Sequence, residues 1–192
     1  QYEVTLELGD ASATTTVEVL GDPRSPYTEG ELQANFEARM SLMAMQDTAN
    51  RAMRQIDVAR ADIETIKRLL SLRLEQEKND DLEALKKQAG NMRKGLDELE
   101  KLYRTPKNTR GITYDGDTVA SKLDTARSYV RPGNGAPSPT ALSYYGILRA
   151  SLERATQEVN VFMTEDLAKF RESVDSAGIS LLSVNETITV PE

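Results

Sequence analysis

The side chains that could take part in chemistry are carboxylates, including Asp57, Asp62, Glu64 and the adjacent pair Glu165-Asp166. Carboxylates that face one another inside a helical bundle can bridge metal ions, and such sites usually place a Glu-x-x-His pair on each of two helices. The chain contains no His and no Cys, so it lacks the usual general base, thiolate nucleophile and soft metal ligands. We therefore expect no catalytic residue, no resident metal and no cofactor site.

Other motifs that carry chemistry are incomplete. The stretch Asp115-Gly116-Asp117 is similar to the start of a calcium loop, but the remaining ligands and the terminal Glu are missing. The chain has no Gly-x-Ser-x-Gly nucleophile elbow and no glycine-rich phosphate loop ending in Gly-Lys-Ser or Gly-Lys-Thr. These absences place an enzyme last among the functions considered for this chain.

A short motif, Asp22-Pro23-Arg24, can be explained in two ways. As a recognition motif it would present a charged pair to a partner. As a structural joint, Pro23 fixes its φ angle, Asp22 accepts backbone N–H groups and Arg24 pairs with a nearby carboxylate. Because Pro26 lies in the same Pro-rich stretch, 23–27, neither a β-ladder nor a helix can continue through it, and we favour the joint.

The segment before this joint, residues 1–22, has the alternation of a β-hairpin. Apolar positions alternate with polar ones on both sides of a Gly-Asp turn: Tyr2, Val4, Leu6 and Leu8, then Thr15, Val17 and Val19. A lone hairpin is marginal in water, so its apolar face should meet further strands or the helices. The start at Gln1, without an initiator Met or a signal segment, suggests a piece of a longer protein.

Residues 28–178 carry the periodicity of a helical bundle. A capping box at Thr28 and Glu31 begins a helix that should run to about Gln76, and further helices are expected at about 80–103, 118–130 and 139–178. Each has an apolar seam stepping by three and four residues. The seams are Leu42, Met45, Ala49, Ala52, Ile56, Ala59, Ile63, Ile66, Leu70; Leu82, Leu85, Ala89, Met92, Leu96, Leu99, Tyr103; Val119, Leu123, Ala126, Val130; and Ala141, Tyr145, Leu148, Leu152, Ala155, Val159, Phe162.

Two irregularities interrupt these helices. After Phe162 the last seam shifts by one residue and continues as Met163, Leu167, Phe170 and Val174, which resembles a stutter that changes the local supercoil. In the second helix, Gly90 and Gly95 should each cost about 1 kcal/mol relative to Ala unless a neighbouring backbone comes close there.

The sequence predicts a mainly α fold, an antiparallel four-helix bundle with long first and last helices plus the small N-terminal β-hairpin. Two arrangements fit the helix lengths. In an up-down-up-down bundle the chain returns to the hairpin at Gly178, so that the alternating tail 179–192 could add a third strand. In a three-layer bundle the two short helices lie end to end opposite the long ones, and Gly178 is at the far end. We favour the first arrangement because it gives the tail a partner.

Charge and composition limit the partners. The 31 acidic residues outnumber the 24 basic ones, and the formal charge of -7 repels nucleic acid and anionic lipid at long range. No apolar run approaches the roughly 20 residues needed to cross a bilayer, so we expect no membrane insertion. The classes of partner that remain open are domains of the same protein, another protein, or a second copy that forms a homodimer.

The N-terminal segments Tyr2-Glu3-Val4-Thr5-Leu6, Thr15-Thr16-Val17-Glu18-Val19 and Gly21-Asp22-Pro23-Arg24 carry a family resemblance. They resemble the last strands of the immunoglobulin-like segment in bacterial sortilin-like β-propeller proteins, which are often labelled glycosyl hydrolases of the BNR-repeat type. A weaker similarity lies at Ala136-Pro137-Ser138-Pro139-Thr140. The resemblance implies an exported protein whose propeller lies upstream, and any glycan-binding or hydrolytic site would belong to that upstream part.

Three functions follow as expectations. The first is a non-catalytic accessory domain that braces or dimerises the upstream domains of a larger exported β-propeller protein. The second is an independent helical adaptor that binds another protein through an exposed seam on its first or last helix. The four methionines Met40, Met43, Met45 and Met53 would suit such a groove, although this spacing favours the core. The third is part of a glycoside hydrolase-like enzyme whose active site lies upstream.

Overall fold

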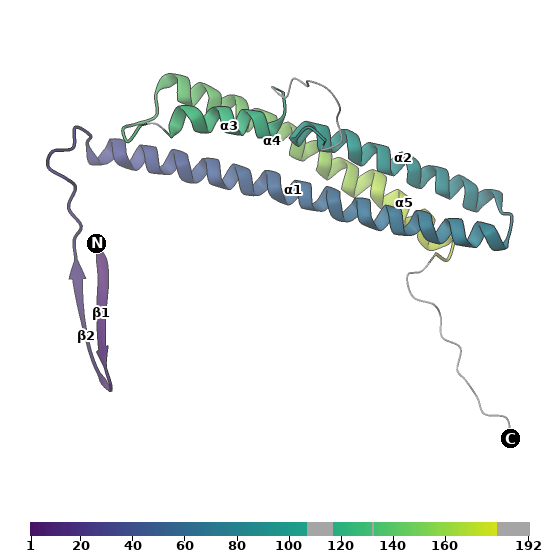
Figure 1. The fold of residues 1–192 in the computed structure, drawn as a ribbon, viewed down its shortest axis with the longest axis horizontal. Coiled ribbons are helices and arrows are strands. Elements are labelled where there is room, and N and C mark those ends of the chain that lie inside the picture. Colours follow the sequence, from purple (N-terminus) through teal and green to yellow (C-terminus); the bar gives the residue numbers. More distant parts are fainter. Residues whose placement is uncertain (107–116, 132, 180–192) are drawn as a thin grey trace.

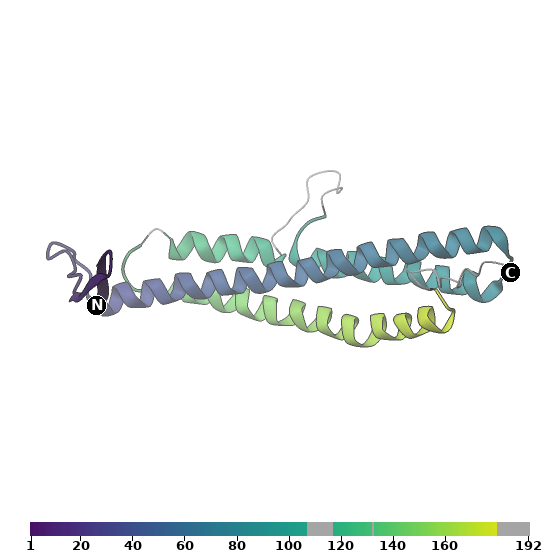
Figure 2. The ribbon, with the colours of Figure 1, turned by 90° about the horizontal axis from the view of Figure 1, so that it is seen from below.

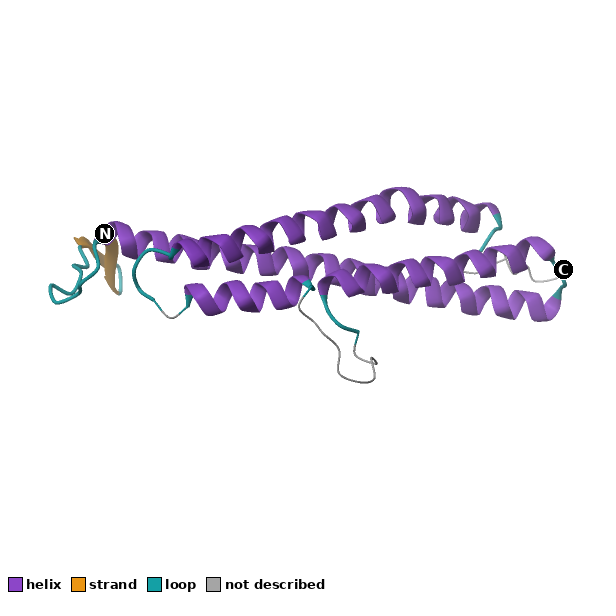
Figure 3. Cartoon of the chain, turned by 90° about the horizontal axis from the view of Figure 1, so that it is seen from above, coloured by secondary structure: helices purple, strands orange, loops and turns teal. Residues whose placement is uncertain are grey.

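The structure is a computed structural model that describes residues 1–106, 117–131 and 133–179 (Figure 1). Its elements in chain order are β1 (Tyr2–Leu8), β2 (Ala11–Val17), α1 (Glu29–Gln76), α2 (Asp80–Tyr103), α3 (Val119–Val130), α4 (Pro139–Val161), the π-helical turn η1 (Phe162–Asp166) and α5 (Leu167–Ser176). The predicted mainly α fold, with a helical bundle and an N-terminal hairpin, is confirmed. Figure 3 shows the hairpin beyond the N-terminal end of the bundle.

The helices form three layers, and the favoured up-down-up-down order was wrong (Figures 1 and 2). Arg73 Nη1, near the end of α1, donates to Ala177 O at 3.3 Å, so the end of α5 lies at the end of α1 far from the hairpin. At the other end, Asn35 Nδ2 donates to Gly133 O, just after α3, at 3.1 Å. The short helices α2 and α3 therefore lie end to end along α1, and α4, η1 and α5 form the third layer parallel to α1.

Helix length explains this arrangement. At about 1.5 Å per residue, α1 is about 72 Å long, whereas α2 and α3 are about 36 Å and 18 Å. The seam of α1 stays apolar along most of its length, so neither short helix could cover it alone. Placing α2 and α3 one after the other buries nearly all of it. The possible third strand within 179–192 lies almost entirely outside the described residues.

The predicted seams form one hydrophobic core. Every seam residue of the four helices is buried or packs, partly buried, against the buried residues. Ile56 and Ile63 of α1, Leu96 of α2 and Leu148 of α4 are almost completely covered. Each fully buried side chain of this size contributes about 1.5 to 3 kcal/mol, so this core supplies the main driving force for the bundle.

The helix ends follow the predicted signals. Thr28 and Glu31 form the capping box of α1, with Thr28 N donating to Glu31 Oε2 at 2.8 Å. Ser138 caps α4 with Pro139 in the first turn, and Gly178, at φ 64°, follows α5. The Asn79 side chain caps α2, which begins at Asp80, and the Thr118 side chain caps α3.

The one-residue seam shift in the last helix is produced by η1. A π-turn accommodates an extra residue within a continuing helix, so the apolar side chains after it face the core again. Val159 before the turn and Phe170 after it are both almost fully buried. The position of the irregularity was predicted, but it is a π-turn rather than a stutter.

The two glycines of α2 differ in their surroundings, and this gives a first prediction. A Cβ added at Gly95 would lie 2.5 Å from Cε2 of Phe162, whereas one added at Gly90 would meet no atom within 4 Å. We expect Gly90→Ala to raise the free energy of unfolding by about 0.8 to 1 kcal/mol through helix propensity. We expect Gly95→Ala to give no gain, or a loss of about 1 kcal/mol, because the Phe162 ring must shift. Urea unfolding measures both.

Gly90→Ala is the control for Gly95→Ala, because the two substitutions are chemically identical and lie on one helix. Adding Phe162→Leu to Gly95→Ala should restore part of the propensity gain by removing the ring atoms that clash. Equal stabilisation by both alanines would contradict the close contact between α2 and η1.

Candidate functional site

The predicted joint is a compact local turn. Asp22 Oδ1 accepts hydrogen bonds from Arg24 N at 2.9 Å and from Arg24 Nε at 3.1 Å, while Asp22 Oδ2 pairs with Arg24 Nη2 at 2.9 Å. The hydrogen bonds from Arg24 lower the pKa of the Asp22 carboxyl. Ser25 N also donates to Asp22 O at 2.9 Å. The structure thus brings Asp22, Pro23 and Arg24 together, with the charged groups of this solvent-exposed motif satisfied within the turn.

The hairpin has one apolar face and one polar face. In its antiparallel register Tyr2 lies opposite Val17, and Leu6 opposite Ala13. Because side chains alternate along a strand, one face carries only apolar residues and one threonine, and the other carries glutamate, serine and threonine. The apolar face consists of Tyr2, Val4, Leu6, Leu8, Ala11, Ala13, Thr15 and Val17.

This apolar face is uncovered. Every residue of β1 and β2 is exposed, and Leu6 and Leu8 retain 72% and 81% of their accessible surface. Figure 1 shows the hairpin lying clear of the helices. A two-stranded hairpin gains little stability alone, and contiguous exposed apolar residues mark interaction sites. The hairpin is therefore the candidate interaction surface of this chain.

A second apolar surface lies on the first turns of α1. Leu32, Phe36, Met40 and Met43 step by four, four and three residues, so they share one face of the helix, and they are 39%, 57%, 48% and 60% exposed. The favoured assignment of the four methionines to the core was therefore wrong for Met40 and Met43. Met45 and Met53 do pack against the core. We call the four exposed residues the α1 stripe.

A charged cluster joins α1 to α2. Arg60 Nη2 pairs with Glu100 Oε2 at 2.5 Å and with Asp97 Oδ1 at 3.2 Å, and Arg60 Nη1 pairs with Asp57 at 2.7 Å. Arg104 Nε donates to the second oxygen of Glu100 at 2.8 Å. Burial of Glu100 alone would raise its pKa, but the hydrogen bonds and charges of Arg104 and Arg60 outweigh burial and lower it. The cluster fixes the register of the two helices.

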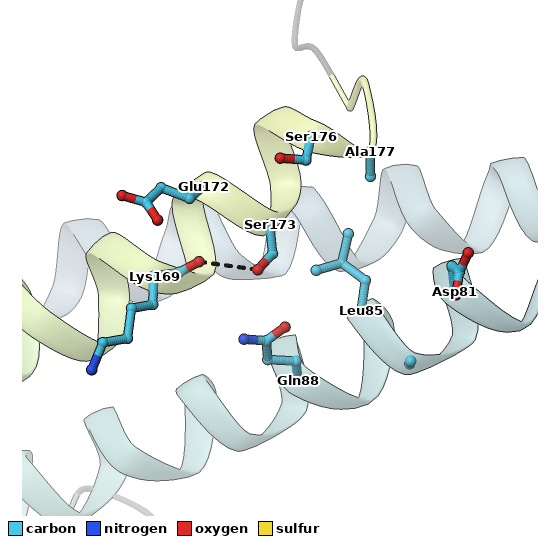
Figure 4. A pocket seen from close by; sticks show the side chains of 9 residues that line it. Asp81, Leu85, Gln88, Lys169, Glu172, Ser173, Ser176 and Ala177 are labelled. Atoms are coloured by element: carbon cyan, nitrogen blue, oxygen red, sulfur yellow. Dashed lines mark hydrogen bonds between the residues drawn. The ribbon is translucent and has the colours of Figure 1, made fainter.

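Two shallow grooves run along the bundle. The larger, of about 710 Å³, lies between α2 and α5, with Leu85 and Gln88 on one side and Lys169 and Ser173 on the other (Figure 4). Ser173 Oγ donates to Lys169 O of its own helix at 3.0 Å rather than to a base. The smaller groove, of about 440 Å³, lies mostly along α4.

Within residues 1–106, 117–131 and 133–179, no three acidic side chains converge to hold a metal ion. None of the helices in those ranges combines the length and the hydropathy needed to span a bilayer. Asp115 and Gly116 of the calcium-loop-like stretch lie outside the described residues.

Sequence reasoning missed three polar residues that hold the helices together, namely Asn35, Arg60 and Glu100. Asn35 is buried and donates from Nδ2 to Gly133 O at 3.1 Å and to Gly135 O at 2.9 Å, so it ties α1 to the connection between α3 and α4. It lies seven residues before Leu42, which extends the seam by one heptad and could have identified it. Arg60 and Glu100 lie beside the seams, where charged residues are ordinary, so no sequence signal marked them.

The chain was compared with known protein families, with curated proteins and with solved structures. No family model matches it, and neither comparison with individual proteins found a match.

Proposed function

We propose that this chain is a non-catalytic accessory domain of a larger, exported β-propeller protein, in which the hairpin docks on upstream β-rich domains and the bundle braces them. One observation carries the proposal: the hairpin presents a wholly uncovered apolar face next to a bundle whose core is complete. The resemblance of residues 2–24 to the end of an immunoglobulin-like segment supplies the class of partner, namely a β-sheet.

The size of the face favours a partner in the same polypeptide. Seven residues in each of two strands cover about 24 Å by 10 Å, a footprint of about 240 Å². Stable interfaces between separate proteins bury about 800 Å² on each partner. A covalent link between the partners raises their effective concentration to the millimolar range, which lets a small apolar contact form.

The bundle suits a bracing role because it is a long rod with few free polar groups inside. Its helices are held by one continuous core and by ion pairs such as Arg60 with Glu100. If the parent protein is a glycosidase-like enzyme, its active site lies upstream, because the family resemblance places the propeller there. The bundle would then position the propeller without taking part in the reaction.

The test is photo-cross-linking in the full-length gene product. A photoreactive amino acid replaces Leu6 on the apolar face or, as a matched control, Glu7 on the polar face of the same strand. We expect the Leu6 position to give an intramolecular cross-link to a β-strand peptide upstream of this chain, and the Glu7 position to give several-fold less. Mass spectrometry of the digested product identifies the linked peptides.

A gene product that has no β-rich segment upstream, or equal cross-linking from both positions, would overturn the proposal.

An additional photoreactive group at Met40 examines the second candidate function, a helical adaptor. The α1 stripe favours that alternative, because amphipathic helices bind partner helices through anchors spaced three and four residues apart. Cross-links from Met40 to another protein, without any from Leu6, would favour the adaptor.

A further inference from the structure

The backbone of the hairpin leaves specific groups free on its outer edges. Leu8 and Ala11 flank the two-residue turn at Gly9, whose φ is 57°, and opposite residues then alternate between hydrogen-bonded and non-hydrogen-bonded pairs. The hydroxyls of Thr5 and Thr14 lie 3.1 Å apart. This short distance is expected of a non-hydrogen-bonded cross-strand pair, in which the side chains are closer together. The N–H and C=O groups of Thr14, and by alternation those of Ser12 and Thr16, therefore point away from β1.

The two edges differ in charge. Strand β1 carries Glu3 and Glu7 at the positions whose backbone groups point outward, and charged residues are a common protection against edge-to-edge pairing. Strand β2, Ala-Ser-Ala-Thr-Thr-Thr-Val, contains no charged residue and no proline, and its last four residues, Thr14 to Val17, are all Thr or Val. It is an exposed, unprotected edge of high β-propensity.

We infer that the β2 edge pairs with the β2 edge of a second copy of this chain, antiparallel about a two-fold axis at Thr14. In this register Thr14 faces Thr14 of the second copy, and Ser12 faces its Thr16, so every outward donor finds an acceptor. The equivalent pairing of two β1 edges about Thr5 would place Glu3 opposite Glu7 twice, which is destabilising. The charge pattern therefore favours β2 of the second copy as the strand that pairs with the β2 edge.

The pairing joins two hairpins into a four-stranded sheet with all apolar faces on one side. Main-chain hydrogen bonds rather than apolar area hold it, so the dimer of the isolated chain is weak and depends on concentration. Asp10 and Glu18 lie just beyond the ends of β2, where they would oppose each other across the axis, so added salt strengthens the dimer. The inference goes beyond the proposed bracing role and does not depend on it.

The test uses single cysteines in a chain that has none of its own. In a hydrogen-bonded pair the Cα atoms are about 5.5 Å apart, within the range that a disulfide can bridge. We expect Thr14→Cys to form a covalent dimer under mild oxidation at least about tenfold faster than Thr5→Cys, which lies directly across the hairpin on the other edge. Non-reducing gel electrophoresis measures the rates.

Proline substitutions test the pairing of the same edge without introducing a disulfide. Thr14→Pro removes the outward N–H of β2, and Thr5→Pro removes that of β1, so both disturb the hairpin similarly. Sedimentation equilibrium should show the dimer weakened about tenfold or more by Thr14→Pro and little changed by Thr5→Pro. A wild-type chain that is monomeric at about 1 mM, or equal rates for the two cysteine variants, would overturn the inference. Neither result bears on docking of the apolar face in the full-length protein.

Discussion

Replacing Glu100 by Gln should lower the free energy of unfolding by about 2 kcal/mol. Glu100 is 8% exposed and accepts charged hydrogen bonds from Arg60 at 2.5 Å and from Arg104 at 2.8 Å. An amide can accept from one arginine only, and its NH₂ group then faces the other. Because Arg60 is largely covered as well, it would keep a positive charge with only the more exposed Asp57 and Asp97 to compensate it.

The control for this prediction is Glu98→Gln on the same helix. The Glu98 side chain is 70% exposed and pairs with Lys101 at 2.6 Å, so its loss should change stability by less than about 0.5 kcal/mol. Chemical denaturation of both variants gives the comparison. Equal effects would show that the cluster between α1 and α2 is no stronger than a surface ion pair.

The pH dependence of the Glu100 effect follows from its lowered pKa. The carboxyl ionises more readily in the folded chain than in the unfolded chain, whose reference value is 4.5. Its stabilisation is therefore complete above that value and is lost as the pH falls through the folded-state pKa. We expect the difference between the wild type and Glu100→Gln to be constant near neutral pH and to shrink below about pH 4.5. A difference that grows in acid would contradict the assignment.

The helices and their buried faces were predictable from the sequence because apolar periodicity reports burial directly. The seam from Leu42 to Leu70 is covered as expected, and the cap at Thr28 began the helix where predicted. The order of the helices was not predictable in the same way. Both arrangements bury the same seams, so periodicity cannot separate them, and the deciding contacts, such as Arg73 with Ala177, join residues far apart in sequence.

The candidate site was predictable in part. Alternation in residues 2–17 identified the hairpin and its apolar face, but only the structure shows that none of the described helices covers that face. Likewise, Met40 and Met45 both lie on α1 at helical spacing from other apolar residues, yet Met40 is exposed and Met45 packs on the core. The difference depends on where α3 and α4 lie around α1, which is a property of the tertiary arrangement.

The isosteric change Asn35→Asp should destabilise the chain by about 3 kcal/mol. The Asn35 amide supplies two donors to two carbonyl oxygens, those of Gly133 and Gly135, from a residue that is 5% exposed. A carboxylate at this place has no donor, so three acceptors would face one another, and a charge would be largely removed from water. Thermal and chemical unfolding would both detect the loss.

The matched control is Asn50→Asp, the same substitution at an exposed position of α1, which should change the free energy of unfolding by less than about 0.5 kcal/mol. Acid should recover part of the Asn35→Asp loss, because a protonated carboxyl regains one donor for one of the two carbonyls. If the two variants are equally stable at neutral pH, the Asn35 amide does not hold the connection between α3 and α4 to α1. That connection would then depend on Arg39, whose Nη2 donates to Arg131 O at 3.2 Å and to Gly133 O at 3.0 Å.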